Sequence, residues 1–203
     1  MDYFYAVVLF AISSTVTPGP NNIMVMTSGL NFGVIKTLPL LIGICVGFAL
    51  MLVLVGLGFS QLFVLYPPLH FIIKCVGVLY LLYLSYLIAM SSGNIDSDSQ
   101  AKPLSFMKGV LFQWVNGKAW VVATGAIAAF TTTGSNFHTQ NLLIALTFFV
   151  VSFPSVGIWV SFGALLKNVI NTPRSRKIFN FTMSGLLVLS VVPVIFEILD
   201  QVA

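Results

Sequence analysis

Charged side chains are scarce in this sequence, which has nine Lys and Arg and five Asp and Glu among 203 residues. A soluble domain of this length would carry roughly 50 charged residues, because about a quarter of its positions are charged. The hydrophobic fraction is 58% and the mean hydropathy is +1.03. These values exclude a soluble globular enzyme and a disordered protein. They also exclude a nucleic-acid binder, because such a protein needs a dense row of basic side chains along the phosphates.

The residue types that most often carry chemistry are also few. The two cysteines, Cys45 and Cys75, lie inside apolar runs without metal-site or redox spacing, so they are interpreted as buried hydrophobic side chains. No Asp or Glu falls in the middle of a long apolar segment. Hydrolytic or redox chemistry inside a membrane would need an acid pair, a histidine cluster or a cysteine pair. We therefore expect no enzyme activity, no cofactor and no metal site.

Long apolar runs are what the sequence has instead. Each is long enough to cross the hydrocarbon core of a membrane as a helix. Strands of a β-barrel would alternate apolar and polar residues, but residues 50–55 are apolar throughout. The sequence therefore predicts an all-α integral membrane protein with a single transmembrane domain over residues 1–203. The six predicted transmembrane helices lie at about 3–28, 38–60, 69–90, 109–130, 141–166 and 181–199.

The basic residues indicate how these spans lie in the membrane. The links after spans two and four contain no Lys or Arg. Cytoplasmic loops carry an excess of Lys and Arg, so the links after spans one, three and five are predicted to be cytoplasmic and both termini to lie on the outer, periplasmic side. These three links contain Lys36, Lys102, Lys108, Lys167, Arg174, Arg176 and Lys177.

The first span is interrupted by a Pro-Gly-Pro run. Two prolines around Gly19 remove backbone donors and break the hydrogen-bond ladder of the helix. Unpaired backbone at membrane depth is tolerated only where it is buried in protein or lines a wet cavity. Pro20 suits the first turn of a second half-helix, whose free N–H groups attract a carboxylate. The candidate binding residues here are Thr17, Pro18, Gly19, Pro20, Asn21 and Asn22.

The fourth span has its own polar interruption, around Gly117. Spans one and four each begin a three-span half, at about 1–90 and 109–203, and a cytoplasmic link at 91–108 joins the halves. Because three is odd, the halves are inserted in opposite directions, and matched breaks in inverted halves indicate a secondary transporter's binding site near the membrane midplane. An ionisable residue in the middle of a span is a functional candidate. The candidates from span four are Gln113, Asn116 and Lys118.

At these residues the chain resembles the lysine-exporter (LysE/RhtB) family of bacterial amino-acid exporters. The resemblance covers essentially the whole chain. Residues 113–120 are similar to the Asn-Pro-Lys motif of that family, except that Gly117 occupies the proline position, which leaves the geometry of span four open. Also similar to the family are the run Thr-Pro-Gly-Pro-Asn at 17–21, residues 28–33, Gly43 with Gly47, and residues 77–84.

The resemblance implies a secondary active exporter that moves amino acids or close derivatives across the bacterial inner membrane, driven by the proton gradient. Branches of the family export lysine, threonine or homoserine, leucine, and cysteine or O-acetylserine. The homoserine/threonine and cysteine/O-acetylserine branches are the candidates, and the sequence does not choose between them. The expected partners are a small zwitterionic amino acid and the lipid bilayer, with no nucleic acid.

A zwitterionic substrate needs one partner for its carboxylate and another for its ammonium group. The half-helix that begins at Pro20 and the ammonium group of Lys118 are expected to bind the carboxylate. The freed carbonyls of Val16 and Thr17 and the neutral amides of both breaks would bind the substrate ammonium group, because no acid lies in the span cores. Removal from water favours the neutral form of a lysine, so Lys118 is also the candidate for proton coupling.

Other interpretations stay open at this point. One alternative is a cation or metal permease of a related family, although the predicted spans have none of the carboxylate, thiolate or histidine clusters that select cations. Another is a non-transport membrane subunit, in which both polar breaks would have no role. Gly29 with Gly33 and Gly43 with Gly47 have the small-xxx-small spacing that lets helices approach closely. Inside a bundle such pairs serve internal contacts more often than dimerisation, so a homodimer also stays open.

Overall fold

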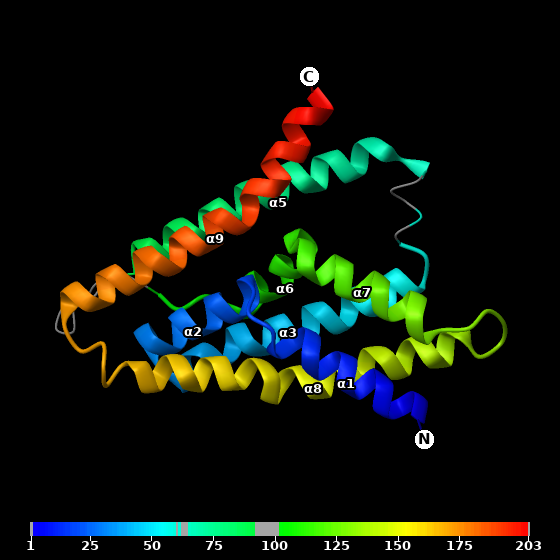
Figure 1. Ribbon diagram of the computed structural model, residues 1–203, viewed down its shortest axis with the longest axis horizontal. Coiled ribbons are helices and arrows are strands. Elements are labelled where there is room, and N and C mark those ends of the chain that lie inside the picture. Colours follow the sequence, from blue (N-terminus) through cyan, green and yellow to red (C-terminus); the bar gives the residue numbers. More distant parts are fainter. Residues whose placement is uncertain (1, 60, 62–64, 92–101, 203) are drawn as a thin grey trace.

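The computed structural model describes residues 2–59, 61, 65–91 and 102–202. Within these residues the protein has eight helices and no strand (Figure 1), which confirms the predicted all-α fold class. Most of the link predicted at 91–108 falls at 92–101, outside the described residues. The helices are α1 (Asp2–Val16), α2 (Pro20–Phe32), α3 (Val34–Gly56), α5 (Pro67–Ala89), α6 (Phe106–Val115), α7 (Gly117–Phe130), α8 (Phe137–Leu166) and α9 (Pro173–Val202).

Four of the described helices are long and apolar enough to cross a membrane. α1 and α7 contribute shorter apolar helices, because the predicted first and fourth spans are each divided in two. That α1 with α2, and α6 with α7, complete six spans in two inverted halves stays a prediction. The four long segments are Val34–Gly56, Phe71–Ala89, Phe137–Leu166 and Pro173–Gln201.

Backbone chemistry accounts for both divisions. α2 begins at Pro20, whose missing N–H is not needed in the first turn of a helix. Its N-cap, Gly19, has extended backbone with φ −175° and ψ −179°. Asn116 alone separates α6 from α7, and its backbone is also extended, with φ −87° and ψ 102°. The helices therefore stop where the sequence predicts breaks, and the second break forms without a proline.

Two helices cross a layer formed by the other six. α5 and α9 run side by side across the upper part of Figure 1, and α1, α2, α3, α6, α7 and α8 lie below them. α2 packs on α8, and α3 packs on both α6 and α8. Toward the right-hand side of this view, α5 and α9 diverge from α7. The break before α2 and the break before α7 both lie within the six-helix layer.

Glycines permit two of the helix crossings. A Cβ atom at Gly163 in α8 would lie 2.0 Å from the carbonyl oxygen of Met26 in α2. A Cβ at Gly43 in α3 would lie 2.1 Å from the carbonyl oxygen of Phe106 in α6. Any side chain at either position would push two backbones apart. Gly43 therefore serves a contact within the chain, which is the use expected of its small-xxx-small pattern.

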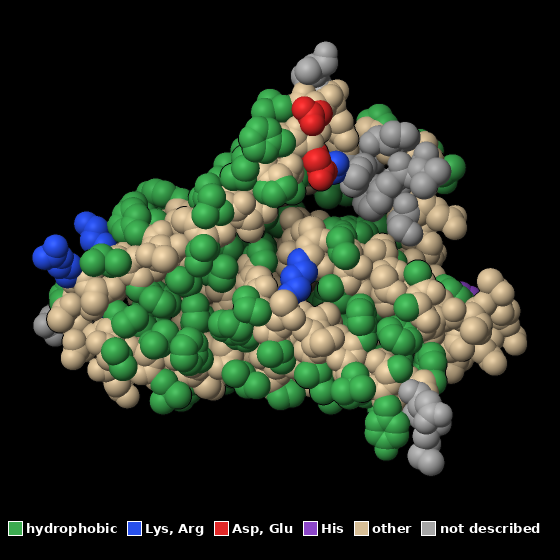
Figure 2. Space-filling view, in the orientation of Figure 1, with side chains coloured by type: hydrophobic (Ala, Val, Ile, Leu, Met, Phe, Trp, Pro, Cys, Tyr) green, Lys and Arg blue, Asp and Glu red, His purple; other side chains and the backbone are tan. Residues whose placement is uncertain are grey.

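The buried side chains form two clusters, and many large apolar side chains lie outside them. One cluster surrounds Met24, Leu40 and Phe112, and the other surrounds Met51 and Phe148. Figure 2 shows hydrophobic side chains along much of α9 and over the helices below it. Helices that are apolar on their outer faces are typical of a protein surrounded by lipid.

Lys and Arg side chains gather at one end of the molecule. The C-terminal ends of α2, α5 and α8 lie at one end in Figure 1, and Figure 2 shows Lys and Arg side chains there. Asn180 joins these segments, because its Nδ2 donates to the carbonyl of Ser91 at 2.6 Å and its amide exchanges two hydrogen bonds with Asn31. Toward the other end, Lys74 Nζ lies 2.7 Å from a carboxylate oxygen of Glu197. The links predicted to be cytoplasmic thus share one end, and the side of the membrane that they face stays a prediction.

Candidate functional site

The two helix breaks meet inside the six-helix layer. Lys118 Nζ, from the first turn of α7, donates to the carbonyl oxygen of Thr17 in the first break at 2.8 Å. Asn21 in α2 and Gln113 in α6 exchange two amide hydrogen bonds, of 3.0 and 3.1 Å. Segments almost a hundred residues apart in sequence are therefore joined by a charged and a neutral contact.

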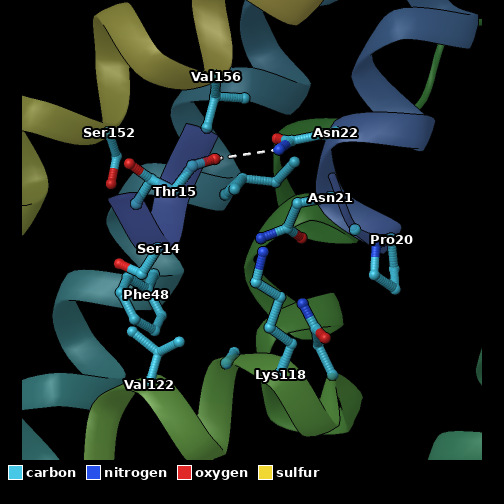
Figure 3. Close-up of a pocket in the computed structure, with 14 residues that line it drawn as sticks. Ser14, Thr15, Pro20, Asn21, Asn22, Phe48, Lys118, Val122, Ser152 and Val156 are labelled. Carbon is cyan, nitrogen blue, oxygen red and sulfur yellow. Dashed lines mark hydrogen bonds between the residues drawn. The ribbon is translucent and has the colours of Figure 1, made fainter. Parts of the chain in front are cut away.

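Lys118 lies across the backbone of the first break. Figure 3 shows its side chain reaching from α7 toward Asn21. A Cβ atom at Gly19 would lie 3.2 Å from Lys118 Cδ and 3.4 Å from Nζ. The absence of a side chain at Gly19 gives the lysine room to reach the Thr17 carbonyl, and the side chain of Lys118 is half-buried there.

Donors from other parts of the chain occupy the carbonyls at the end of α1. Asn22 Nδ2 donates to the carbonyl of Thr15 at 3.0 Å, which is the dashed line in Figure 3, and to that of Thr17 at 2.9 Å. The indole of Trp159 in α8 donates to the carbonyl of Val16 at 3.0 Å. Asn22 is only 3% exposed, so its buried amide stabilises the backbone conformation of the break. A substrate ammonium group would share these carbonyls, each of which has two lone pairs.

The first turn of α2 supplies donors of a different kind. The first four N–H groups of a helix have no acceptor within it, and together with the aligned peptide dipoles they give the end a partial positive charge. No side chain caps α2, since its N-cap is Gly19. Pro20 lacks an N–H, which leaves the N–H groups of Asn21 and Asn22 as the inner donors of this turn. Together with Lys118, this end of α2 forms an electropositive site.

A central cavity of about 40 Å³ lies between these groups. A cavity of this size has room for water but is smaller than sites that hold organic ligands, so the cavity would have to widen to hold an amino acid. Polar atoms line one part of the cavity and apolar side chains the other. The lining residues are Ser14, Thr15, Gly19, Pro20, Asn21, Asn22, Ile44, Phe48, Asn116, Lys118, Ala119, Val122, Ser152 and Val156.

The structure brings most of the predicted site residues to this cavity. Thr17 and Pro18 are exposed and do not line it, although the Thr17 carbonyl accepts the hydrogen bond from Lys118. Gln113 is fully buried next to the cavity and contacts it through Asn21. Six of the nine candidates line the cavity directly: Gly19, Pro20, Asn21, Asn22, Asn116 and Lys118. That these residues bind a substrate stays a prediction.

Some residues that line the central cavity were not among the candidates predicted from the sequence. Ser14 and Thr15 directly precede the predicted break, so their position was a usable signal. Ser152 is a buried polar residue of α8, two positions before Pro154, and a buried polar group in an apolar run is also a signal. The sequence gives no signal that Phe48 lines the cavity, because nothing distinguishes it from the other core phenylalanines.

Gly117 occupies a position that suits proline, and Gly117→Pro is expected to raise the midpoint of thermal unfolding slightly without loss of function. Gly117 is the first residue of α7, where the N–H has no intrahelical acceptor, and no atom lies within 4 Å of the place where its Cβ would be. The preceding Asn116 already has the extended backbone that proline demands. The gain should be about 0.4–1 kcal/mol, and a fluorescence thermal-unfolding curve of the detergent-purified protein measures it.

Gly125→Pro is the matched control for this substitution. Gly125 lies in the interior of the same helix and also has nothing within 4 Å of its Cβ position, so only the backbone differs between the two sites. Proline in a helix interior costs about 3 kcal/mol. Equal losses of stability for both variants would show that the break at Asn116 does not accept proline.

Comparison with known proteins gives the family. The family described as "LysE type translocator" matches residues 12–195. The chain belongs to this family. The family resemblance read from the sequence is thereby confirmed, and membership in a translocator family, together with the apolar helices, supports a multi-pass membrane protein that is not an enzyme.

Curated relatives of this LysE type translocator share its sequence over part of their length. A protein of Escherichia coli (strain K12) named "Cysteine/O-acetylserine efflux protein" is 33% identical over 122 residues, as are proteins of the same name in Shigella flexneri and Shigella sonnei (strain Ss046). Each match covers 60% of this chain and 62% of the relative, so the chain spans less than two thirds of these relatives. No solved structure matches the chain.

Proposed function

We propose that this LysE type translocator is a secondary active exporter of small zwitterionic amino acids or close derivatives across the bacterial inner membrane. The observation that carries the proposal is the meeting of the two helix breaks, where Lys118 Nζ lies 2.8 Å from the Thr17 carbonyl at the edge of the central cavity. The name of the relatives that match the chain favours cysteine and O-acetylserine as substrates.

The proposed architecture has six spans in two inverted halves. α1 with α2 forms the first span and α6 with α7 the fourth, so each half begins with a divided helix. The grouping of the three Lys- and Arg-bearing links at one end supports this topology, with both termini on the periplasmic side. Breaks in matching helices of inverted halves bring a binding site to the middle of the membrane.

Two groups of donors are available to a substrate carboxylate. The first-turn N–H groups of α2 and the ammonium group of Lys118 lie on adjoining sides of the central cavity. A carboxylate carries a full negative charge, whereas the Thr17 carbonyl is neutral, so a lysine ammonium group binds the carboxylate more strongly. A carboxylate would therefore compete with the Thr17 carbonyl for Lys118, and substrate binding would loosen the contact that joins the two breaks.

Neutral oxygen atoms are available to the substrate ammonium group. The lining residues that the structure describes include Ser14, Thr15, Asn116 and Ser152, which carry side-chain oxygens, and none of them is Asp or Glu. Binding through neutral groups implies modest affinity, which suits a transporter that must release its cargo outside. It also disfavours a substrate with a second positive charge, because Lys118 would repel it.

Lys118 is the proposed coupling group. Among the described residues that line the central cavity, no other is Asp, Glu, His, Lys or Arg. In its charged form it can hold the Thr17 carbonyl or a carboxylate, and in its neutral form it can release both. A cycle in which Lys118 alternates between these forms would link substrate release to proton movement.

Transport by the purified protein in liposomes tests the proposal. Liposomes are loaded with radiolabelled cysteine, O-acetylserine, threonine, homoserine, leucine or lysine, and a pH gradient is imposed across the membrane. Efflux of cysteine or O-acetylserine above that of protein-free liposomes, and its loss when an uncoupler removes the gradient, is the expected result. Efflux of none of the six compounds would overturn the proposal.

A further inference from the structure

A second cavity, of about 600 Å³, lies at the end of the molecule where the Lys- and Arg-bearing links gather. α2 contributes one wall, the last turn of α5 and Ser91 another, and Lys102 to Lys108 the third. Its volume falls within the range of small-molecule binding sites, whereas the central cavity is far smaller. Its polar lining residues are Thr27, Ser28, Asn31, Tyr86, Ser91, Lys102 and Lys108.

The chemistry of this second cavity is that of an anion site. Two lysines line it, and none of its described lining residues is Asp or Glu. Lys102 is exposed, whereas Lys108 is half-buried with its Nζ 3.3 Å from the hydroxyl of Tyr83 and 5.2 Å from the centre of that ring. The two ammonium groups are therefore not neutralised by an ion pair within the described part of the lining.

Ser91 supplies an unused hydroxyl in the same wall. It is 7% exposed, and its Oγ has no hydrogen-bond partner among the described residues. A buried hydroxyl without a partner is unfavourable and is rare in native proteins. The backbone beside it is held firmly, since Asn180 donates to the Ser91 carbonyl and exchanges hydrogen bonds with Asn31. The Oγ atom itself is buried in this conformation, so a rotation of the Ser91 side chain toward the cavity would let a ligand oxygen satisfy the hydroxyl.

Helix α2 connects the second cavity with the central one. Asn22 lines the central cavity, and Met24, Thr27 and Ser28 line the second. At 1.5 Å per residue, Asn22 and Ser28 are about 9 Å apart along the helix axis. Met24 is fully buried between these positions, so one turn of α2 with the Met24 side chain separates the two cavities.

We propose that the second cavity is the cytoplasmic entrance site, which binds the substrate carboxylate through Lys102, Lys108 and the Ser91 hydroxyl. The substrate then passes Met24 along α2 to the central cavity. This inference rests on the proposed export function. An anionic lipid headgroup has a similar chemistry, but two features favour the transported molecule: the Ser91 hydroxyl, which has no partner among the described residues, and the position of the cavity one helical turn from the central one.

Inside-out membrane vesicles test the entrance site, because their outer surface is the cytoplasmic face. The variants are Ser91→Ala, which removes a hydroxyl without a partner among the described residues, Lys102→Gln, and the two combined. Uptake of radiolabelled cysteine by the double variant should show a KM raised about fivefold to tenfold with kcat unchanged, as expected for the loss of contacts to one exposed and one buried donor. Lys36→Gln is the matched control, since it removes an exposed lysine from the same end but not from the cavity, and it should leave KM unchanged.

Two further comparisons identify what the cavity recognises. Cysteine methyl ester has no carboxylate, so its KM should not differ between the wild-type protein and the double variant. An equal rise for the ester would overturn carboxylate recognition. If the effect on cysteine appears in liposomes that contain phosphatidylglycerol and is absent in pure phosphatidylcholine, the cavity binds a lipid headgroup and the proposal is wrong.

Direct binding separates failure of the entrance site from failure of the export function. Wild-type transport with an unchanged KM in the double variant would overturn the entrance site and leave the export function standing. Where the wild-type protein transports nothing, binding of radiolabelled cysteine to purified Lys118→Met protein reports mainly the entrance site, because the central site has lost its charged donor. Binding to that protein should be lost when Ser91→Ala and Lys102→Gln are added, and its persistence would overturn the proposal.

Discussion

Lys118→Met is expected to reduce pH-driven efflux about 100-fold. Lys118 is the one ionisable side chain in the described part of the central cavity lining, and it is the donor that joins the two helix breaks through the Thr17 carbonyl. A hydrogen bond from a charged group contributes about 1.5–3 kcal/mol, and the larger value corresponds to roughly 100-fold in rate. Methionine has a similar length and fills the space next to Gly19, but it has neither the donor nor the charge. Efflux from loaded liposomes under an imposed pH gradient measures the effect.

Lys118→Arg distinguishes binding from coupling. Arginine keeps the positive charge at this position but does not release its proton. Exchange of labelled for unlabelled substrate at equal pH needs only the charge, whereas net efflux driven by a pH gradient needs a group that gains and loses a proton. The arginine variant should therefore retain exchange and lose gradient-driven efflux, and the methionine variant should lose both.

Lys74→Met provides the matched control for Lys118. Lys74 is also a lysine within a predicted span, but it pairs with Glu197 near the end of α9. The pair is partly exposed, with 16% and 58% of the two side chains accessible, and such pairs contribute little to stability. Wild-type efflux by Lys118→Met, or an equal loss in both variants, would contradict a coupling role that is specific to Lys118.

The sequence was informative where covalent chemistry decides the structure. Proline removes a backbone donor whatever surrounds it, so the break at Pro18 and Pro20 could be predicted from the residues alone. The break at Asn116 has no proline, and it was predicted from a polar cluster inside an apolar run. Both predictions concern local backbone, and the structure has extended residues at both positions.

The contacts across the site could not be predicted in the same way. The Asn21–Gln113 pair and the indole of Trp159 on the Val16 carbonyl join residues about 90 and 140 positions apart. Such contacts depend on how the helices cross and on the side-chain rotamers, which hydropathy does not encode. Sequence reasoning also treated the carbonyls at the end of α1 as free, whereas in this conformation Asn22, Trp159 and Lys118 occupy them.

The crossing of α2 and α8 is the packing contact on which the site depends most. Gly29 in α2 was marked from its spacing, but its counterpart Gly163 in α8 was not. A Cβ at Gly29 would lie 2.4 Å from the Val160 carbonyl oxygen, and a Cβ at Gly163 would lie 2.0 Å from the Met26 carbonyl oxygen. The two glycines therefore face the backbone of each other's helix. This contact fixes the position of α2, which carries Asn21 and Asn22 into the central cavity at one end and Ser28 into the second cavity at the other.

Gly163→Ala is accordingly expected to destabilise the protein by about 3 kcal/mol, the upper part of the range for overpacking. The clash is with backbone atoms of Met26, at 2.0 Å from the carbonyl oxygen and 2.8 Å from the carbon, and these atoms have no rotamer that would relieve it. In a chain of this size such a loss lowers the melting temperature by roughly 6–12 °C, which thermal unfolding in detergent measures.

Gly157→Ala is the control in the same helix, because its Cβ would meet only a Leu41 methyl group at 4.0 Å. Since alanine favours a helix more than glycine does, the Gly157→Ala variant should be as stable as the wild-type protein or slightly more stable. A melting temperature for Gly163→Ala equal to that of the control would mean that α2 and α8 are not held by backbone contact.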